Sequence, residues 1–346
     1  MTRLVSDSKK FWREAWSTDV VVAGGGLLLR AFVQAGVFVL IARGLGPEAY
    51  GSFVALVAIA TLLVPCLTIG HEFLVLRTLA VDGRAPWQAV AGGIAKTALL
   101  APAIIGAVAF ACAVWMPQQV SFAIAVSVLV ADALLGAWLE IAWRTFQGLE
   151  RMPAVALIRL MPSMSRLIAA VLLCSSAGAL SLSAWVFAYL IASIVASAAV
   201  FIVLVQILGR PVVELSFRLV WLEGVPFAVN ALAERATNDI DKALLSGLDG
   251  ARSAGLYGAA YRLVEIAVVP LSAVVMSANA RLFRAGNAGI EHLEPLLRRL
   301  LSGVLAYGLI VGCLVFVTAP IFARVLGPEF SKSVEMMRWL AAFPLL

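Results

Sequence analysis

Charged residues are scarce in this chain of 346 residues. Asp, Glu, Lys and Arg make up only 13% of it, whereas hydrophobic residues make up 62%. Soluble domains usually carry about 25% charged residues. The mean hydropathy of +1.00 is likewise too high for a water-soluble globule. The shortage of charge therefore excludes a soluble domain and predicts a membrane protein with several spans.

Residues for common catalytic chemistry are also few. The chain has two histidines, His71 and His292, far apart in sequence. It contains neither a Gly-rich phosphate-binding loop nor a Walker-type lysine, so an ATP-driven pump or a hydrolase would lack its parts. We therefore predict that the protein is not an enzyme and that it uses no cofactor and no metal. Its four cysteines fall inside apolar runs, which favours packing residues over disulfides or metal ligands; they are Cys66, Cys112, Cys174 and Cys313.

Long apolar runs dominate the chain instead. A helix crosses a bilayer with ~20 mostly apolar residues, whereas barrel strands show short alternating patterns that this sequence lacks. The runs predict an all-α polytopic membrane protein with about nine or ten transmembrane helices. We place them at residues 20–42, 51–70, 90–115, 120–142, 154–174, 184–208, 219–245, 254–280 and 297–320, with a tenth beginning near residue 331.

Basic residues in the connections predict the orientation of these helices. Fourteen Lys and Arg, including Arg144 and Arg151, lie in the N-terminal segment or in alternate connections after it, whereas the other side has only Arg43, Arg252 and Arg324, with Lys242 near the membrane edge. We expect a cytoplasmic N-terminus. Residues 1–19, which are polar with interspersed aromatics, suit an interfacial segment on anionic lipid. Lipid anchoring therefore accounts for the net charge of +6 better than nucleic-acid binding does.

One turn motif occurs twice, 207 residues apart: GLGPEAYG ends at Gly51 and GLDGARSAGLYG ends at Gly258. Because this offset covers six predicted spans, an even number, it predicts two parallel six-helix lobes around a central cavity. The lobes would comprise residues 20–208 and 209–346, the second lacking roughly 70 residues, so we expect a fragment or a truncated chain. Within the motifs, Gly46-Pro47 and Gly250 should break helices, and Gly51 and Gly258 should allow close helix approach.

Ionisable residues inside predicted spans are the most informative signal, since they are costly in lipid and usually face a bundle interior or a wet cavity. In the first lobe, Arg30 and Arg166 lie near the predicted midplane, where they would line a cavity. Their guanidinium groups suit a diphosphate. Lys96 and Arg159 lie shallower, so snorkelling to the interface is the alternative. The acidic residues of these spans are Asp132 and Glu140.

The second lobe carries more acidic residues in its spans. Arg235 lies two residues from position 237, the counterpart of Arg30 at the repeat offset. Glu265 follows Arg262 by three residues, so an ion pair within the helix and a functional role are both open. Near the end of the second span, His71 and Glu72 are either an interfacial polar pair or a proton-handling or headgroup site.

Four segments, in order and across nearly the whole chain, resemble the polysaccharide flippases. This family comprises the oligosaccharide-lipid translocases of the multidrug/oligosaccharidyl-lipid/polysaccharide exporter superfamily. The segments are ARGLGPEAYG at 42–51, FQGLERM at 146–152, DIDKALLSGLDGARSAGLYGAAYRL at 239–263 and VLGPEFSKSVEMMRWLA at 325–341.

The resemblance implies a transporter that flips a polyprenyl-diphosphate-linked oligosaccharide across a bacterial inner membrane, by alternating access, for O-antigen or exopolysaccharide synthesis. The candidate diphosphate or cavity residues are Arg30, Lys96, Arg159, Arg166 and Arg235. Asp132, Asp241 and Glu265 are candidates for a coupling cation. Asp241 matches a position that the family tends to keep acidic, and pairing with Lys242 is its alternative role. Expected partners are lipid-linked oligosaccharide, membrane lipids and polysaccharide polymerase or assembly proteins, but no nucleic acid.

Three alternatives stay open. A cation-coupled multidrug exporter of the same fold would need aromatic and acidic cavity walls, and the basic first lobe argues against it. A peptidoglycan-precursor flippase also favours buried arginines. A non-transporting partner in a polysaccharide assembly complex is the third alternative, because an incomplete second lobe would leave hydrophobic helix faces unpaired.

Overall fold

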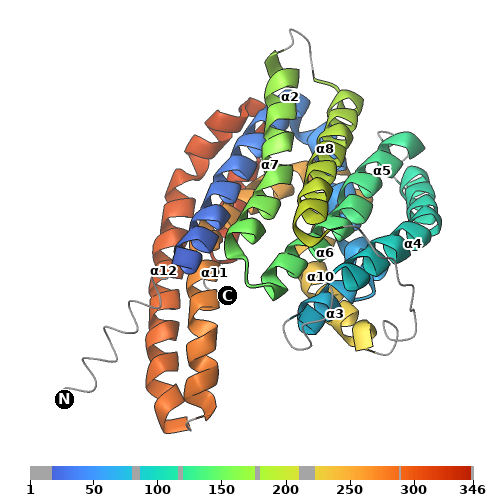
Figure 1. The fold of residues 1–346 in the computed structure, drawn as a ribbon. Coiled ribbons are helices and arrows are strands. Elements are labelled where there is room, and N and C mark those ends of the chain that lie inside the picture. Colours follow the sequence, from blue (N-terminus) through green and yellow to red (C-terminus); the bar gives the residue numbers. More distant parts are fainter. Residues whose placement is uncertain are drawn as a thin grey trace. The chain divides into compact units, whose positions relative to one another are not determined.

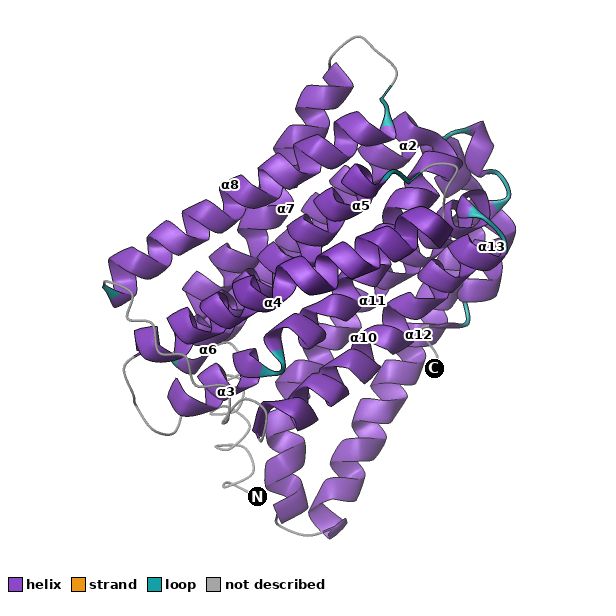
Figure 2. Ribbon diagram, turned by 90° about the vertical axis from the view of Figure 1, so that its right-hand side faces the viewer, coloured by secondary structure: helices purple, strands orange, loops and turns teal. Residues whose placement is uncertain are grey.

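The computed structural model describes residues 18–79, 86–115, 120–175, 180–209, 223–287 and 290–343. In these ranges the chain forms helices joined by short connections, and no strand occurs (Figures 1 and 2). The all-α prediction is thus confirmed. Most of the predicted N-terminal segment 1–19 and the beginning of the predicted span 219–245 lie outside the described residues.

Besides the α-helices, the described chain contains two short helical turns of other types. A π-helical turn, η2 (Val130–Leu134), joins α5 to α6, and a 3-10 turn, η4 (Pro328–Phe330), precedes the last helix. The helices are α2 (Thr18–Thr68), α3 (His71–Arg77), α4 (Pro86–Trp115), α5 (Phe122–Leu129), α6 (Leu135–Gly148), α7 (Met152–Ser175), α8 (Leu182–Leu208), α10 (Val225–Leu248), α11 (Ala251–Asn287), α12 (Ile290–Leu326) and α13 (Ser333–Leu340).

Seven helical segments of the described chain are long and apolar enough to cross a bilayer: Gly25–Thr68, Val90–Trp115, Phe122–Gly148, Met152–Ser175, Leu182–Leu208, Ala251–Leu271 and Leu300–Leu326. The predicted spans 20–42 and 51–70 correspond to the two helical stretches of α2, which meet at a kink at Gly46, where the backbone is not helical. Helix α10 is not among the seven, since charged residues occupy its middle. Helix α13, at the predicted tenth span, has eight residues.

The chain divides into two compact units. Unit 2 is Gly36–Gly258, and unit 1 combines the described residues up to Ala35 with those from Ala259 onward. Both α2 and α11 therefore contribute to each unit. These units differ in extent from the predicted lobes 20–208 and 209–346, whose repeat relationship stays a prediction.

Unit 2 is built around an apolar core between α3, α4, α6, α7 and α8, helices that lie beside one another in Figure 1. Its side chains include Phe146 and Ile141, both fully buried. Ser121 and Ser181 begin α5 and α8: each side-chain oxygen accepts a hydrogen bond from a backbone N–H three residues on, which satisfies one of the unpaired donors at a helix start. These caps explain why both helices begin directly after short polar connections.

The predicted helix breaks at Gly46 and Gly250 are confirmed, and a third Gly-containing turn occurs at Gly327. Gly46 has φ 72°, Gly250 φ 91° and Gly327 φ 114°. Only glycine adopts such angles without strain. Each break thus falls in one of the sequence segments quoted above.

The two turn motifs contact each other within unit 2. A β-carbon built on Gly51 would lie 1.7 Å from the carbonyl oxygen of Ala251, and one on Gly255 would lie 1.8 Å from that of Pro47. The backbones of α2 and α11 therefore touch, as predicted for Gly51. The closer glycine on α11 is Gly255, because a β-carbon on Gly258 would meet only the Val54 side chain, at 3.1 Å.

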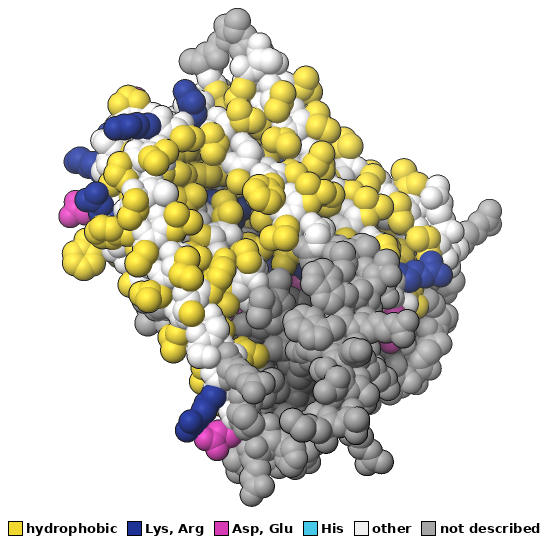
Figure 3. Space-filling model, turned by 90° about the vertical axis from the view of Figure 1, so that its left-hand side faces the viewer, with side chains coloured by type: hydrophobic (Ala, Val, Ile, Leu, Met, Phe, Trp, Pro, Cys, Tyr) yellow, Lys and Arg dark blue, Asp and Glu magenta, His cyan; other side chains and the backbone are white. Residues whose placement is uncertain are grey.

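The exposed side chains of the long helices are largely apolar. Leu172 of α7, Ile191 of α8 and Val317 of α12 are each more than half exposed. Figure 3 shows apolar side chains covering most of the described surface on one face, with few charged residues among them. Such a surface suits contact with lipid tails. The protein is thus a multi-pass membrane protein.

Candidate functional site

Polar side chains of unit 2 gather in three clusters. The first, the Asp132 cluster, comprises Asp132, Arg166, Tyr189 and Ser193. Arg166 Nη2 lies 2.6 Å from Asp132 Oδ1, and the Tyr189 hydroxyl lies 2.8 and 2.7 Å from the two carboxylate oxygens. Arg166 also donates to the Ser193 hydroxyl at 3.1 Å. Every group in this cluster thus has a close polar partner.

Local structure holds the Asp132 cluster in place. Asp132 occupies the π-helical turn η2, an insertion that changes the direction of side chains within a helix and is frequent at functional sites. The Arg166 guanidinium lies 4.1 Å from the centre of the Tyr189 ring. That ring packs edge-on against Phe53 at 5.1 Å and lies 5.5 Å from Trp185. The aromatic contacts fix Tyr189, and Tyr189 in turn fixes the carboxylate.

The second cluster, the Glu140 cluster, comprises Glu140, Arg144, Arg235, Arg159 and Glu72. Its ion pairs are long: Arg235 Nη2 lies 3.7 Å from Glu140 Oε2, and Arg144 Nε lies 4.0 Å from Glu140 Oε1. Hydrogen bonds between charged groups are usually ~2.7–2.9 Å. The two guanidinium groups therefore face the carboxylate without forming short hydrogen bonds to it.

Aromatic rings lie beside the arginines of the Glu140 cluster. The Arg144 guanidinium lies 4.0 Å from the Trp143 ring centre and 4.6 Å from that of Phe73. The Arg159 guanidinium lies 4.8 Å from the same Trp143 ring. Stacking on aromatic faces orients a guanidinium while leaving its in-plane N–H donors available for other partners.

Glu72 is the most buried acid of the Glu140 cluster, with 1% of its surface exposed. Its Oε2 atom has no hydrogen-bond partner among the described residues. Burial raises the pKa of Glu72, and the negative charge of Glu140 raises it further, while a hydrogen bond with the Thr68 side chain and the positive charge of Arg235 oppose this shift. Helix α3, which carries Glu72, lies outside the seven candidate spans.

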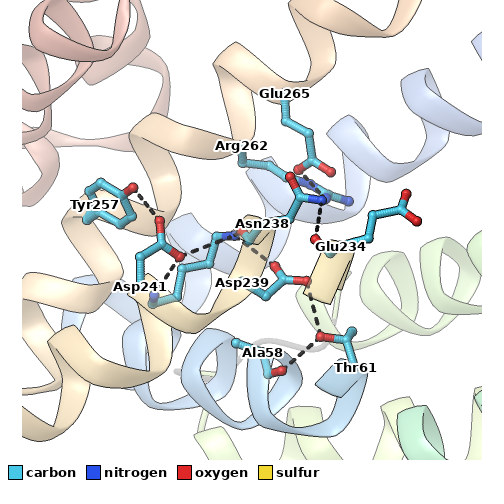
Figure 4. A network of polar contacts seen from close by, with 10 residues as sticks. Ala58, Thr61, Glu234, Asn238, Asp239, Asp241, Tyr257, Arg262 and Glu265 are labelled. Atoms are coloured by element: carbon cyan, nitrogen blue, oxygen red, sulfur yellow. Dashed lines mark hydrogen bonds and ion pairs between the residues drawn. The ribbon is translucent and has the colours of Figure 1, made fainter. Parts of the chain in front are cut away.

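The third cluster joins α2, α10 and the start of α11 (Figure 4). Lys242 Nζ lies 2.8 Å from Asp239 Oδ1, and the Thr61 hydroxyl donates to Asp239 Oδ2 at 3.1 Å. The Tyr257 hydroxyl donates to Asp241, whose other oxygen accepts from the Lys242 backbone N–H at 2.7 Å. The ionic partner predicted as an alternative for Asp241 is therefore close, with Lys242 Nζ at 3.9 Å.

The predicted site residues are distributed over these clusters. Arg166 lies with Asp132, and Arg159 and Arg235 lie in the Glu140 cluster. Lys96 is buried in α4, with 6% of its surface exposed. Their predicted roles in binding substrate or a coupling ion stay predictions.

Two predicted site residues belong to unit 1. Glu265 Oε2 lies 2.8 Å from Arg262 Nη1, which is the intrahelical ion pair left open by the sequence. Both side chains are substantially exposed, so this pair contributes little to stability. Arg30 is partly buried on the unit 1 portion of α2.

Sequence reasoning missed Arg144, Trp143, Tyr189 and Ser193. Arg144 was counted among the connection residues because the fourth span was expected to end at 142, and this was wrong: α6 continues to Gly148. Its spacing of four residues from Glu140 is typical of an ion pair on one helix face and was the available signal. Tyr189 and Ser193 are uncharged and left no such signal.

Carboxylates of the described residues do not assemble into a metal site. Among the residues that the structure describes, no group of three or more His, Cys, Asp or Glu is placed to hold a metal ion. The acids instead face arginine, lysine or tyrosine. This arrangement suits binding of anions or protons, since the cations can exchange partners.

Seven candidate spans in an all-helical fold define the class as a multi-pass membrane protein. The solved outward-facing structure of a multidrug resistance MATE family transporter of the MOP superfamily matches with a TM-score of 0.61 at 15% identity, covering 94% of this chain and 79% of that chain. A MOP superfamily transporter from Pyrococcus furiosus, described by the reverse polarity of its binding pocket, gives the same values. A MATE crystal structure in the straight conformation reaches a TM-score of 0.64 at 16% identity, with the same coverage.

The family follows from the sequence match. The model of the polysaccharide biosynthesis protein family matches residues 18–279, so the chain belongs to this family. No curated protein sequence matches it. The fold of this chain resembles that of the solved MOP superfamily transporters.

Proposed function

We propose that this protein flips a polyprenyl-diphosphate-linked oligosaccharide from the cytoplasmic to the outer leaflet of a bacterial inner membrane, for surface or extracellular polysaccharide synthesis. Membership of the polysaccharide biosynthesis family supports the substrate class. The fold, shared with exporters, supports alternating access as the mechanism.

The observation that carries the proposal is the loose geometry of the Glu140 cluster. Arg144, Arg159 and Arg235 are partly buried. Arg144 and Arg159 lie on the Trp143 ring. Arg144 and Arg235 face the Glu140 carboxylate without a short hydrogen bond to it. A diphosphate offers oxygens that guanidinium forks bind in pairs. We therefore assign the diphosphate to Arg144, Arg159 and Arg235.

Arg166 differs, because its short ion pair with Asp132 would have to open before it could bind phosphate. In the proposed cycle Arg166 supports the bundle, while the sugars occupy a wet cavity and the polyprenyl chain stays in lipid. Asp132, Asp241 and Glu265 remain candidates for a coupling cation, and Arg30 and Lys96 for further cavity contacts. A coupling charge moving across the membrane would supply ~2.3 kcal/mol per 100 mV.

A second candidate is a multidrug exporter, which the MATE neighbours favour at the level of fold. Cationic drugs would need unpaired acids and aromatic walls; Glu72 and Trp143 offer one of each, whereas Glu140 is paired with arginine. The excess of arginine over accessible carboxylate in the Glu140 cluster favours an anion instead.

Complementation in a flippase-deficient bacterium tests the proposal. The wild-type chain should restore surface polysaccharide, and Arg235→Ala and Arg144→Ala should each reduce export by about tenfold or more, since a charged hydrogen bond is worth ~1.5–3 kcal/mol. Arg252→Ala is the matched control, because Arg252 is an exposed arginine of the same unit. Equal amounts of each variant must reach the membrane. Normal export by both variants, or drug resistance conferred without export, would overturn the proposal.

A further inference from the structure

We propose that the Glu72 carboxyl group is a proton-binding site that controls the anion affinity of the Glu140 cluster. In its protonated form Glu72 leaves Arg144 and Arg235 available to a diphosphate; in its ionised form it competes with the diphosphate for them. The identity of the anion rests on the proposed function, whereas the proton site itself does not.

The position of Glu72 disfavours a permanent charge. Its side chain is almost completely buried, and Oε2 lacks a hydrogen-bond partner among the described residues. A buried carboxylate without a full set of partners is costly, and the usual escape is to take up a proton. The raised pKa of this residue agrees with that expectation.

The charged groups around Glu72 come from two neighbouring helices. Glu140 and Arg144 of α6, with Arg235 of α10, interact with it electrostatically, and Glu234 of α10 acts on Arg144. From α2 it meets the Thr68 side chain. Helix α4 also packs against α3, where a β-carbon on Gly93 would lie 2.2 Å from the His71 ring; the nearest ionisable residue on α4 in sequence is Lys96.

The charge of Glu72 changes the electrostatic environment of Arg144 and Arg235. When Glu72 is neutral, Glu140 is the acid that Arg144 and Arg235 share at 4.0 and 3.7 Å. When Glu72 loses its proton to water, a second carboxylate interacts electrostatically with the same two guanidinium groups. The carboxyl O–H bond breaks, its electron pair stays on the carboxylate, and the proton forms a new O–H bond on the accepting water. Proton release would therefore weaken the hold of the arginines on a bound anion.

The backbone next to Glu72 links it to α10. Ile69 has φ 51° and Gly70 has φ 71°, so the chain makes a sharp break between α2 and α3. Such an angle is strained for a β-branched residue. A β-carbon on Gly70 would lie 2.2 Å from the carbonyl oxygen of Gly224, directly before α10 begins. A shift of α3 on ionisation of Glu72 would thus reach the helix that carries Arg235.

Infrared difference spectroscopy of the purified protein tests the proton site directly. Protonated carboxyl groups give a carbonyl-stretch band that shifts in D₂O. When the wild-type protein is titrated from acidic to alkaline pH, one such band should disappear at a pH above the ordinary Glu pKa of about 4.3. Glu72→Gln should lack this band. Glu329→Gln is the matched control, because Glu329 is exposed, and it should keep the band. Its persistence in Glu72→Gln would overturn the proposal.

Binding of inorganic pyrophosphate tests the control of anion affinity. As the pH rises through the Glu72 titration, the affinity of the wild type for pyrophosphate should fall. The affinity of Glu72→Gln should fall by about tenfold less, because Gln imitates the protonated carboxyl. Parallel pH profiles of the two proteins would overturn the control role. If pyrophosphate does not bind the wild type at all, the diphosphate site and the control role fail together, while the infrared result still decides the proton site.

Discussion

The Asp132 and Glu140 clusters use the same chemistry with different geometry. Each pairs arginine with a carboxylate inside unit 2, and Arg166 and Arg235 are similarly accessible, with 21% and 27% of their side chains exposed. Yet Arg166 approaches its acid to 2.6 Å and Arg235 only to 3.7 Å. Burial therefore does not distinguish the clusters; the supply of additional partners does.

The first cluster is closed, meaning that additional partners complete its hydrogen bonds. The second is open, meaning that its ion pairs to Glu140 stay long. Tyr189 and Ser193 complete the hydrogen bonds of the Asp132–Arg166 pair.

In the Glu140 cluster Arg144 and Arg235 share one acid at long distance. The Arg144 guanidinium lies on the Trp143 ring and donates one hydrogen bond, to Gln147 Oε1 at 3.0 Å. A closed cluster is expected to stabilise the fold, whereas an open one can exchange partners with a substrate.

Removing Arg166 should give the largest effect on stability. Arg166→Ala leaves Asp132 charged and without its cation in the bundle, and breaking a pair of this kind costs about 3–5 kcal/mol. Unfolding of the purified protein in one detergent, by heat or denaturant, measures the loss. The double variant Asp132→Asn with Arg166→Ala should recover much of it, because no orphaned charge remains.

Arg252→Ala, which removes an exposed arginine of the same unit, controls for the loss of a positive charge. Should Arg166→Ala unfold like this control, the closed cluster would not stabilise the fold, and the comparison between the two clusters would fail.

The sequence predicted much of this arrangement and missed its decisive part. Apolar runs located most of the spans, Gly-containing motifs located the breaks at Gly46 and Gly250, and the cost of charge in lipid singled out Asp132 and Arg166. Their pairing joins positions 34 apart in sequence on different elements. No periodic pattern encodes such a contact, and the completing groups of Tyr189 and Ser193 resemble ordinary span residues.

The Glu140 cluster was harder to predict, for two physical reasons. Apolar counting ended the fourth span before Arg144, although α6 continues through it to Gly148. The positive φ angles at Ile69 and Gly70 precede a new helix, α3, on which the Glu72 side chain is buried. Hydropathy does not predict where the backbone of a helix breaks, or that the break lies against another helix.

Protonation of Glu72 should have an intermediate effect on the free energy of unfolding, and this effect should depend on pH. The pKa of Glu72 is raised in the folded protein. At pH values between the unfolded-state pKa of about 4.3 and this raised pKa, the folded state therefore binds more protons than the unfolded state. Stability should therefore fall as the pH rises through this window, by ~1.4 kcal/mol for each unit of the shift. The measurement is the stability difference between wild type and Glu72→Gln, which cancels the other carboxylates. A difference that is constant, or that changes in the opposite direction, would show that Glu72 does not gain a proton on folding.

Removing Arg235 should give the smallest effect on stability and so sharpens the comparison most. Its contacts are a 3.7 Å ion pair with Glu140 and a 3.5 Å hydrogen bond to the Thr61 carbonyl. Glu140 keeps Arg144 as a neighbour when Arg235 is absent. Arg235→Ala should therefore lower the free energy of unfolding by about 1 kcal/mol or less, measured in the same detergent as Arg166→Ala. A loss as large as that of Arg166→Ala would mean that Arg235 supports the fold, and its effect on export could then no longer be attributed to the substrate.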